Sequence, residues 1–275
     1  MNKFKNKVVV ITGAGGVICS TLAKEIAKLG SKVMLLDLNL DAATKVSNEI
    51  NELGYTSKAY KANVLDKEEL LKVKEDINKC YGKVDILING AGGNNPKATT
   101  NNEYHLESKD LDKSFFDLDP SGVEFVFNLN FLGTFIPTQV FAKDMVGNIE
   151  SSILNVSSMN AYHPLTKIPA YSGAKAAVSN FTEWLAVHFS KVNIRVNAIA
   201  PGFFVTNQNK SLLFNNDGSP TERTKKILNA TPMGRFGDVS ELVDATLFLL
   251  DPVKASFITG VVLPIDGGFN AYSGV

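Results

Sequence analysis

The sequence has few of the residues that indicate a disulfide-stabilised or nucleic-acid-binding protein. Only two of its 275 residues are cysteine, Cys19 and Cys80, which excludes a disulfide framework and favours a reducing cytosol. Its 28 basic and 28 acidic residues give a formal net charge of zero, and only Arg195, Arg223 and Arg235 among the basic ones are arginine. Balanced charge without blocks of one sign indicates neither a nucleic-acid partner nor an anionic membrane surface.

Long apolar runs are also missing, since no stretch approaches the roughly 20 residues that cross a bilayer. The N-terminal MNKFKNKVVVITGAGG carries the positive charges of a signal peptide. Its apolar run is short, however, ends in glycines and lacks a small-residue cleavage site, so it is interpreted as a first strand. The sequence therefore predicts a soluble, cytoplasmic protein whose length suits one large α/β domain.

Short apolar runs alternate with amphipathic stretches along the chain. Helical patterns cover 20–30, 41–54 and 67–82, and each ends in glycine, the residue that most easily adopts the left-handed C′ conformation. The nearly continuous Val/Ile/Leu runs are typical of parallel strands buried on both faces. We expect a single domain with a doubly wound, Rossmann-type parallel sheet. Its predicted strands are 7–12, 32–37, 57–62, 84–89, 151–156, 194–200 and 260–266.

Two segments, about 93–118 and 203–231, interrupt this alternation. Both are polar or of mixed composition, and both follow the carboxyl end of a predicted strand. Open α/β sheets bind ligands at that edge, and long irregular segments in a compact domain are usually functional lids or disordered. We expect both segments to contact the substrate.

The stretch TGAGGVIC, residues 12–19, follows the first predicted strand and indicates a phosphate-binding turn. Gly13 and Gly15 match the start of G-x-G-x-x-G, but Ile18 occupies the last position, so a merely tight turn remains an alternative. Asp37 ends the second strand, where a carboxylate can bind the ribose hydroxyls of NAD and repel the 2′-phosphate of NADP. Since no cation follows Asp37 directly, NAD is favoured, although a simple polar strand end is the alternative.

The stretch PAYSGAKAA places Tyr171 and Lys175 four residues apart, on one face of a helix that starts near Pro169. A nearby ammonium and a helix N-terminus both favour a phenolate. Lowering the phenol pKa by about 3 requires roughly 4 kcal/mol, which this arrangement and a cofactor cation can supply. The alternative interpretation of this spacing is a solvated helix face.

Further motifs occur in order along the whole chain, and together they resemble the short-chain dehydrogenase/reductase family. They are the glycine turn, Asp37, NGAG at 89–92, Asn130 in NLNFLG, Ser158, Tyr171, Lys175 and Pro201–Gly202. The chain departs from the family's T-G-x-x-x-G-x-G at Val17 and Cys19, and Asn63 replaces the usual Asp beside the adenine. We expect the dinucleotide still to bind, with a slightly altered fit, and the fold to be unaffected.

The resemblance implies a catalytic set of Asn130, Ser158, Tyr171 and Lys175. It implies that Ser158 and Tyr171 contact the substrate oxygen, that Lys175 binds the nicotinamide ribose, and that Asn130 anchors a proton-relay water. The implied cofactor-binding residues are Gly13, Gly15, Gly16, Val17, Ile18, Asp37, Asn63, Val64, Asn89, Gly90, Ala91, Tyr171, Lys175, Pro201, Gly202 and Thr206.

Longer phrases, including NGAGGNNPKATT and PLTKIPAYSGAKAA, are similar to the D-mannonate oxidoreductase (fructuronate reductase) branch of this family. That similarity implies NAD-dependent interconversion of D-fructuronate and D-mannonate. A sugar acid needs many hydrogen-bond partners and a cation. Lys97 is the predicted carboxylate partner. The predicted substrate residues are Asn94, Asn95, Lys97, Ser158, Asn160 and His163, with Asn207 and Gln208 as further candidates.

Two other functions stay open: another sugar-acid or polyol reductase, such as a gluconate 5-dehydrogenase-like enzyme, and a non-catalytic NAD-sensing protein. The complete Asn–Ser–Tyr–Lys set argues against the sensor, which needs no proton relay. The three histidines have no acidic or thiol neighbours at ligand spacing, so no metal site is predicted. Aromatic and aliphatic residues on more than one face of the helix around His188, together with the resemblance, predict a homodimer or homotetramer.

Overall fold

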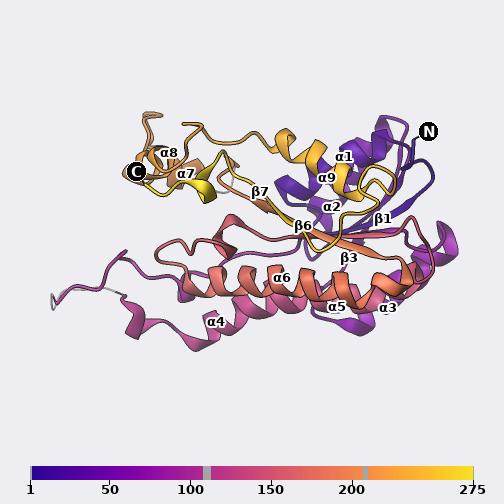
Figure 1. Cartoon of the computed structure of the whole chain (residues 1–275), viewed down its shortest axis with the longest axis horizontal. Coiled ribbons are helices and arrows are strands. Elements are labelled where there is room, and N and C mark those ends of the chain that lie inside the picture. The colour runs from indigo at the N-terminus through magenta and orange to yellow at the C-terminus, as the bar shows by residue number, and fades with distance from the viewer. Residues whose placement is uncertain (1, 108–112, 207–209, 275) are drawn as a thin grey trace.

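The computed structural model describes residues 2–107, 113–206 and 210–274 (Figure 1). Within these residues seven strands form one parallel sheet in the order β3-β2-β1-β4-β5-β6-β7. This is the Rossmann strand order with one strand added, so the predicted fold class is confirmed. The strands are β1 Val8–Thr12, β2 Lys32–Asp37, β3 Thr56–Lys61, β4 Ile86–Asn89, β5 Ser152–Val156, β6 Arg195–Pro201 and β7 Val262–Ile265.

Helices cover both faces of the sheet, with α1, α2 and α9 on one face and α3, α5 and α6 on the other (Figure 1). Gly30, Gly54 and Gly82 follow three of these helices with φ of +82°, +85° and +107°, which confirms the predicted left-handed ends. The helices are α1 Val17–Lys28, α2 Leu40–Glu52, α3 Lys67–Cys80, α4 Pro120–Phe127, α5 Gly133–Met145, α6 Pro169–His188, α7 Lys210–Leu213, α8 Glu222–Asn229 and α9 Val243–Leu250.

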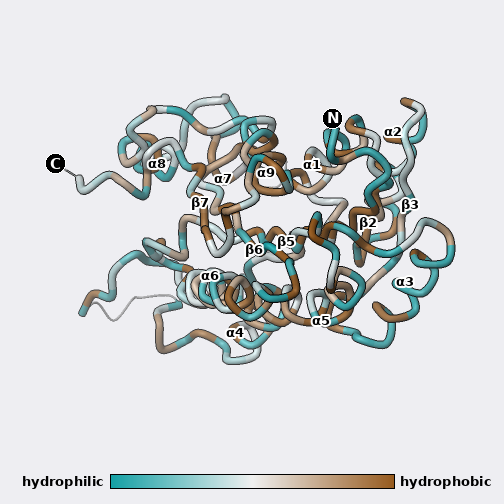
Figure 2. Tube along the Cα trace, turned by 45° about the vertical axis from the view of Figure 1, so that its right-hand side comes forward, coloured by the Kyte–Doolittle hydropathy of each residue, from teal (hydrophilic) through white to brown (hydrophobic). Residues whose placement is uncertain are grey.

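Each strand contributes to two hydrophobic cores because successive side chains point to opposite faces. In β1, Val9 and Ile11 pack with α1 and α2, whereas Val8 and Val10 pack with α3, α5 and α6. Figure 2 shows hydrophobic residues in the strands at the centre of the fold. Burial on both faces explains why the strand sequences are almost continuously apolar.

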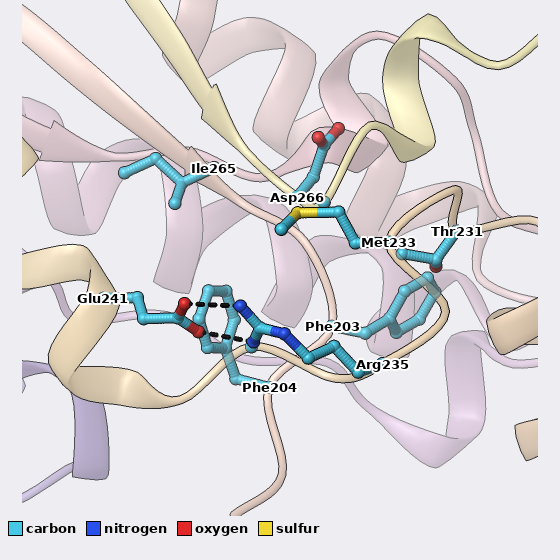
Figure 3. A pocket seen from close by; sticks show the side chains of 10 residues that line it. Phe203, Phe204, Thr231, Met233, Arg235, Glu241, Ile265 and Asp266 are labelled. Atoms are coloured by element: carbon cyan, nitrogen blue, oxygen red, sulfur yellow. Dashed lines mark hydrogen bonds and ion pairs between the residues drawn. The ribbon is translucent and has the colours of Figure 1, made fainter.

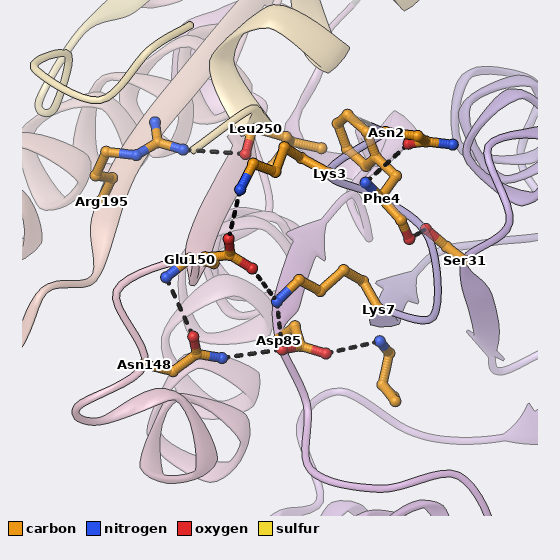
Figure 4. Close-up of polar contacts among 11 residues, drawn as sticks. Asn2, Lys3, Phe4, Lys7, Ser31, Asp85, Asn148, Glu150, Arg195 and Leu250 are labelled. Atoms are coloured by element: carbon orange, nitrogen blue, oxygen red, sulfur yellow. Dashed lines mark hydrogen bonds and ion pairs between the residues drawn. The ribbon is translucent and has the colours of Figure 1, made fainter. Parts of the chain in front are cut away.

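A polar network fixes the amino-terminal edge of the sheet, opposite the edge that carries the candidate site (Figure 4). The Asp85 carboxylate accepts hydrogen bonds from the Val8 N–H at 2.9 Å and from the Lys7 ammonium at 3.2 Å. Lys7 also pairs with Glu150 at 2.8 Å. These contacts hold the starts of β1, β4 and β5 in register and thereby align their carboxyl ends.

The run from α4 through α5 is long and largely apolar. By length and composition alone, residues 120–145 would be long enough to cross a membrane, but half of the apolar window is buried inside the fold. Phe141 and Met145 are fully buried against the sheet. The run therefore packs as a core helix, interrupted by a π-helical turn at Asn128–Leu132.

Candidate active site

A groove of about 350 Å³ opens where the strand order reverses, between the carboxyl ends of β1 and β4. In an open α/β sheet this is the position where a dinucleotide binds. Eight of the predicted cofactor-binding residues line it: Gly13, Gly15, Gly16, Asp37, Asn63, Val64, Gly90 and Ala91. The others lie outside its lining, and the Asn89 amide instead donates to Thr138 and Asn155 at 3.0 and 2.9 Å.

The glycine turn exposes backbone donors because there is no room for side chains. Gly13 has a φ of +65°, and a Cβ there would lie 2.8 Å from the Ala91 Cα. A Cβ on Gly15 would lie 2.7 Å from the Ala42 Cβ. Gly16 caps α1 with no side-chain hydrogen bond, and the first turn of α1 has no acidic residue. This uncapped, positive helix end suits the pyrophosphate of a dinucleotide.

Asp37 is positioned by backbone donors at one end of the groove. Its carboxylate accepts from the Gly15 N–H at 2.9 Å and from the Asn39 N–H at 2.8 Å. Each oxygen keeps a free lone-pair direction for a ribose hydroxyl. The exposed Leu38 and Asn39 that follow offer no cation for a 2′-phosphate, so the groove fits NAD better than NADP.

Cys19, at one of the missing glycine positions, points from α1 toward the turn after β4. A Cβ added to Gly90 would overlap the Cys19 Sγ, so the thiol fills the space between this helix and Gly90. Burial raises the pKa of the Cys19 thiol to about 12. Val17 and Ile18 do not line the groove. The side chains that replace glycine in this turn therefore lie outside the lining of the groove.

The predicted catalytic residues converge beside this groove. Tyr171 and Lys175 lie in the first two turns of α6, and Ser158, which follows β5, lies close enough to the Tyr171 hydroxyl to lower its pKa. The Lys175 Nζ donates to the Val156 carbonyl at 2.8 Å and lies 5.7 Å from the centroid of the Tyr171 ring. The end of β5 and the start of α6 thus bring a phenol, a hydroxyl and an ammonium together.

Asn130 lies in the π-helical turn and is completely buried. Its amide donates to the Gly93 carbonyl at 2.7 Å and the Val126 carbonyl at 2.8 Å, and it accepts from the Gly93 N–H at 3.2 Å. π-helical turns are frequent at functional sites. Through its hydrogen bonds with Gly93, Asn130 fixes the segment that follows β4 to the π-helical turn.

Gly92 joins the groove to the catalytic residues. A Cβ at this position would lie 2.6 Å from the Asn130 Oδ1 and 3.1 Å from the Lys175 Nζ, and Gly92 itself lines the groove. Only glycine leaves both side chains in place. Gly92 was not among the predicted site residues, although its position in NGAG was a usable signal.

Known proteins resemble this arrangement over the whole chain. The family model for short chain dehydrogenases matches residues 7–216. An uncharacterized oxidoreductase of Haemophilus influenzae is 62% identical over 275 residues, covering 100% of this chain and 96% of the relative. The uncharacterized oxidoreductase UxuB of Bacillus subtilis is 49% identical over 269 residues, covering 98% and 96%.

A crystal structure from Haemophilus influenzae, described as a candidate D-mannonate oxidoreductase with bound NAD, has a TM-score of 0.96 and 62% identity. It covers 98% of this chain and 97% of its own. The chain belongs to the short-chain dehydrogenase family. The resemblance seen in the sequence is therefore confirmed.

Burial shifts the pKa values of Tyr171 and Lys175, the two titratable groups of the predicted catalytic set. Burial raises the pKa of Tyr171, and the hydrogen bond with Ser158 only partly opposes it. Burial also lowers the pKa of Lys175 from 10.5 to about 8. The sequence led us to expect a lowered phenol pKa. In the protein without cofactor the pKa of Tyr171 is raised instead, because desolvation of the phenolate outweighs the stabilisation that Ser158 provides.

The predicted substrate residues of this short-chain dehydrogenase fall into two groups. Asn94 and Asn95 bind residues of their own loop. The Asn94 amide donates to the Thr99 hydroxyl at 2.9 Å, and the Asn95 Oδ1 accepts from the Lys97 N–H at 2.9 Å. The Lys97 ammonium pairs with Asp119 at 3.1 Å on the surface. Asn207 and Gln208 lie outside the described residues.

Asn160 and His163 follow Ser158. The Asn160 N–H donates to the Ser158 Oγ at 3.2 Å, while its buried Oδ1 has no hydrogen-bond partner within the described chain. The His163 Nε2 contacts the Asn270 carbonyl at 3.0 Å, which ties this segment to the C-terminal residues. Pro201, Gly202 and Thr206 lie at or after the end of β6, where the Gly202 N–H donates to the Ile265 carbonyl at 2.9 Å.

Proposed function

We propose that this chain is an NAD-dependent oxidoreductase that interconverts D-fructuronate and D-mannonate by hydride transfer. The observation that carries the reaction type is that Asn130 and Lys175 lie close to Gly92, which lines the dinucleotide groove. The substrate assignment is supported by the identity of 62% to the candidate D-mannonate oxidoreductase that binds NAD. Cytoplasmic location and homo-oligomeric assembly are part of the proposal.

NADH bound in the groove would supply the hydride to the substrate ketone. Tyr171 then donates its proton to the developing alkoxide, and its raised pKa keeps the phenol protonated for this step at neutral pH. Ser158 polarises the same oxygen through its hydroxyl. In the reverse direction the Tyr171 oxygen accepts the proton, which requires the phenolate and hence a higher pH.

Lys175 and Asn130 hold the geometry of this step. The Lys175 ammonium, fixed by the Val156 carbonyl, would bind the nicotinamide ribose and favour the phenolate when the cofactor is present. The side-chain amide of Asn130 is fully bonded, and its backbone carbonyl accepts from the Thr134 hydroxyl at 2.9 Å, so the second lone pair of that carbonyl is the anchor we propose for a proton-relay water. The segments 93–118 and 203–231 would surround the polyhydroxy substrate, with Asn160 close to Ser158.

Replacement of Tyr171 distinguishes the proposed enzyme function from that of a non-catalytic NAD-sensing protein. Tyr171→Phe should reduce kcat for D-fructuronate reduction by at least about a hundredfold, because the proton donor is lost, while NADH still binds. Tyr162→Phe is the matched control, since the Tyr162 hydroxyl donates to the Val262 carbonyl at 2.5 Å instead of serving the reaction. Equal activity of Tyr171→Phe and Tyr162→Phe would contradict the mechanism.

A further inference from the structure

A second cavity, of about 180 Å³, lies at the same carboxyl edge of the sheet as the catalytic residues. Its walls come from the three segments that follow β4, β5 and β6, represented by Glu103, Leu165 and Phe203, and from α8. The Thr100 N–H donates to the Lys167 carbonyl at 2.9 Å, which joins the first two segments. The cavity therefore lies beside the segment that connects Ser158 to α6.

Two cations on α8, Arg223 and Lys226, line this cavity one helical turn apart. The Lys226 ammonium is held by both oxygens of Glu103, at 2.9 and 3.0 Å. Arg223 makes no hydrogen bond or ion pair with any residue that the structure describes. The cavity therefore contains one neutralised cation and one guanidinium whose donors are available.

The other two arginines are engaged. Arg235 forms two hydrogen bonds to Glu241, at 2.7 and 2.8 Å, beside the smaller pocket that Phe203 also lines (Figure 3). Arg195 donates to the carbonyls of Leu249 and Leu250 at 2.6 and 3.0 Å (Figure 4 shows the latter). Within the described chain Arg223 is thus the arginine left for a ligand.

The surroundings of Arg223 suit one carboxylate. A guanidinium binds a carboxylate through two parallel hydrogen bonds, and these are stronger where apolar walls exclude water. Phe203 and Phe269 supply such walls, with ring centroids 5.3 Å apart. A hexuronate ketone carries its carboxylate at the opposite end of the carbon chain from the reacting ketone, so the two groups require neighbouring but separate subsites.

We propose that Arg223 binds the carboxylate of the substrate and thereby selects sugar acids over neutral ketoses. This inference rests on the proposed function and replaces Lys97, whose ammonium is already paired with Asp119. Phe203 follows the Pro201–Gly202 turn at the end of β6, so it places the carboxylate subsite next to the strand that borders the catalytic residues.

Binding of D-mannonate to the NADH-loaded protein, measured by calorimetry, tests this subsite. Arg223→Gln should weaken binding about 10- to 100-fold, and the KM for D-fructuronate should rise by a similar factor with a smaller change in kcat. Arg223→Lys keeps the positive charge but loses the paired N–H donors of the guanidinium. Its affinity for D-mannonate should therefore lie between those of the wild type and Arg223→Gln. Lys225→Gln is the control, because it removes the same charge from the same helix while its ammonium pairs with Glu222 outside the cavity.

Glu103→Gln should act in the opposite direction and tighten D-mannonate binding several-fold, because the cavity loses its carboxylate and Lys226 is released. If Arg223→Gln and Lys225→Gln bind D-mannonate equally well while the wild type turns over D-fructuronate, the subsite is wrong and the proposed function stands. If the wild type neither binds D-mannonate nor reduces D-fructuronate, both are overturned. Unchanged circular dichroism spectra and melting temperatures exclude misfolding as the cause of a loss.

Discussion

Replacing Lys175 by methionine should abolish activity and yet stabilise the cofactor-free protein. The Lys175 side chain is 4% exposed, and among the described residues its ammonium forms no ion pair. Its hydrogen-bond acceptor is the Val156 carbonyl. An ammonium held in this way loses most of its hydration without gaining a counter-charge, and methionine of similar length removes that cost.

The size of the effect follows from the lowered pKa. A fall from 10.5 to about 8 corresponds to roughly 3 kcal/mol of disfavoured protonation, because each tenfold change is worth about 1.4 kcal/mol. Losing the hydrogen bond to Val156 costs about 1–2 kcal/mol. Lys175→Met should therefore gain about 1–2 kcal/mol at pH 7, which raises the melting temperature by roughly 2–5 °C in a protein of this size.

The gain should also depend on pH. The folded protein holds the Lys175 proton less tightly than the unfolded chain, so the stability of the wild type rises as the pH increases from about 8 to 10.5. The advantage of Lys175→Met is then complete below pH 8 and disappears by about pH 9.5. Urea denaturation at pH 7 and pH 9.5, without cofactor, measures both values.

Lys74→Met provides the contrasting control. The Lys74 ammonium pairs with Asp144 at 2.8 Å, and both side chains are largely buried. Its removal leaves Asp144 unpaired and should destabilise the protein by about 3 kcal/mol. If Lys175→Met destabilises the protein at pH 7, or changes its stability equally at both pH values, the account of Lys175 as a buried, uncompensated charge is refuted.

Three further predictions concern the groove. Gly90→Ala should destabilise the protein by about 1–3 kcal/mol because the new methyl group overlaps the Cys19 thiol, and adding Cys19→Ala should recover at least half of the loss in urea denaturation. A maleimide should label the exposed Cys80 in the folded protein and leave the buried Cys19, with its raised thiol pKa, unreacted until denaturant is added. Asp37→Ser should raise the KM for NADH about tenfold and reduce the preference for NADH over NADPH. Steady-state kinetics with both cofactors measures this, and an unchanged preference would contradict the role of Asp37.

The sheet could be predicted from the sequence because parallel strands buried on both faces are apolar throughout. All seven predicted strands lie within two residues of the observed ones at each end, and glycines mark the ends of three helices as expected. Helix α8 was not predicted, because only Ile227 and Leu228 among its eight residues are apolar. A usable signal was present, since Thr221 caps the helix by accepting from the Thr224 N–H and Glu222 opens its first turn.

The positions of the site residues could be predicted where short motifs determine them. Properties that depend on contacts between distant segments could not. The sequence placed Tyr171 and Lys175 on one helix face, but the pKa of the phenol depends on burial by segments far away in the chain. Lys97 was expected to face the substrate, yet Asp119, brought close by the fold, pairs with its ammonium. Arg223 was not singled out, because only the fold shows that Arg195 and Arg235 are engaged while Arg223 pairs with none of the described residues.

The central claim is that this chain reduces D-fructuronate with NADH. We would follow the absorbance of NADH with the purified protein and D-fructuronate, alongside 5-ketogluconate and fructose, and repeat the series with NADPH. We expect rapid oxidation of NADH with D-fructuronate, little with fructose, and a much slower reaction with NADPH. Bound NADH that is not oxidised in the presence of any of the three substrates would contradict the substrate claim and leave the fold and family unaffected.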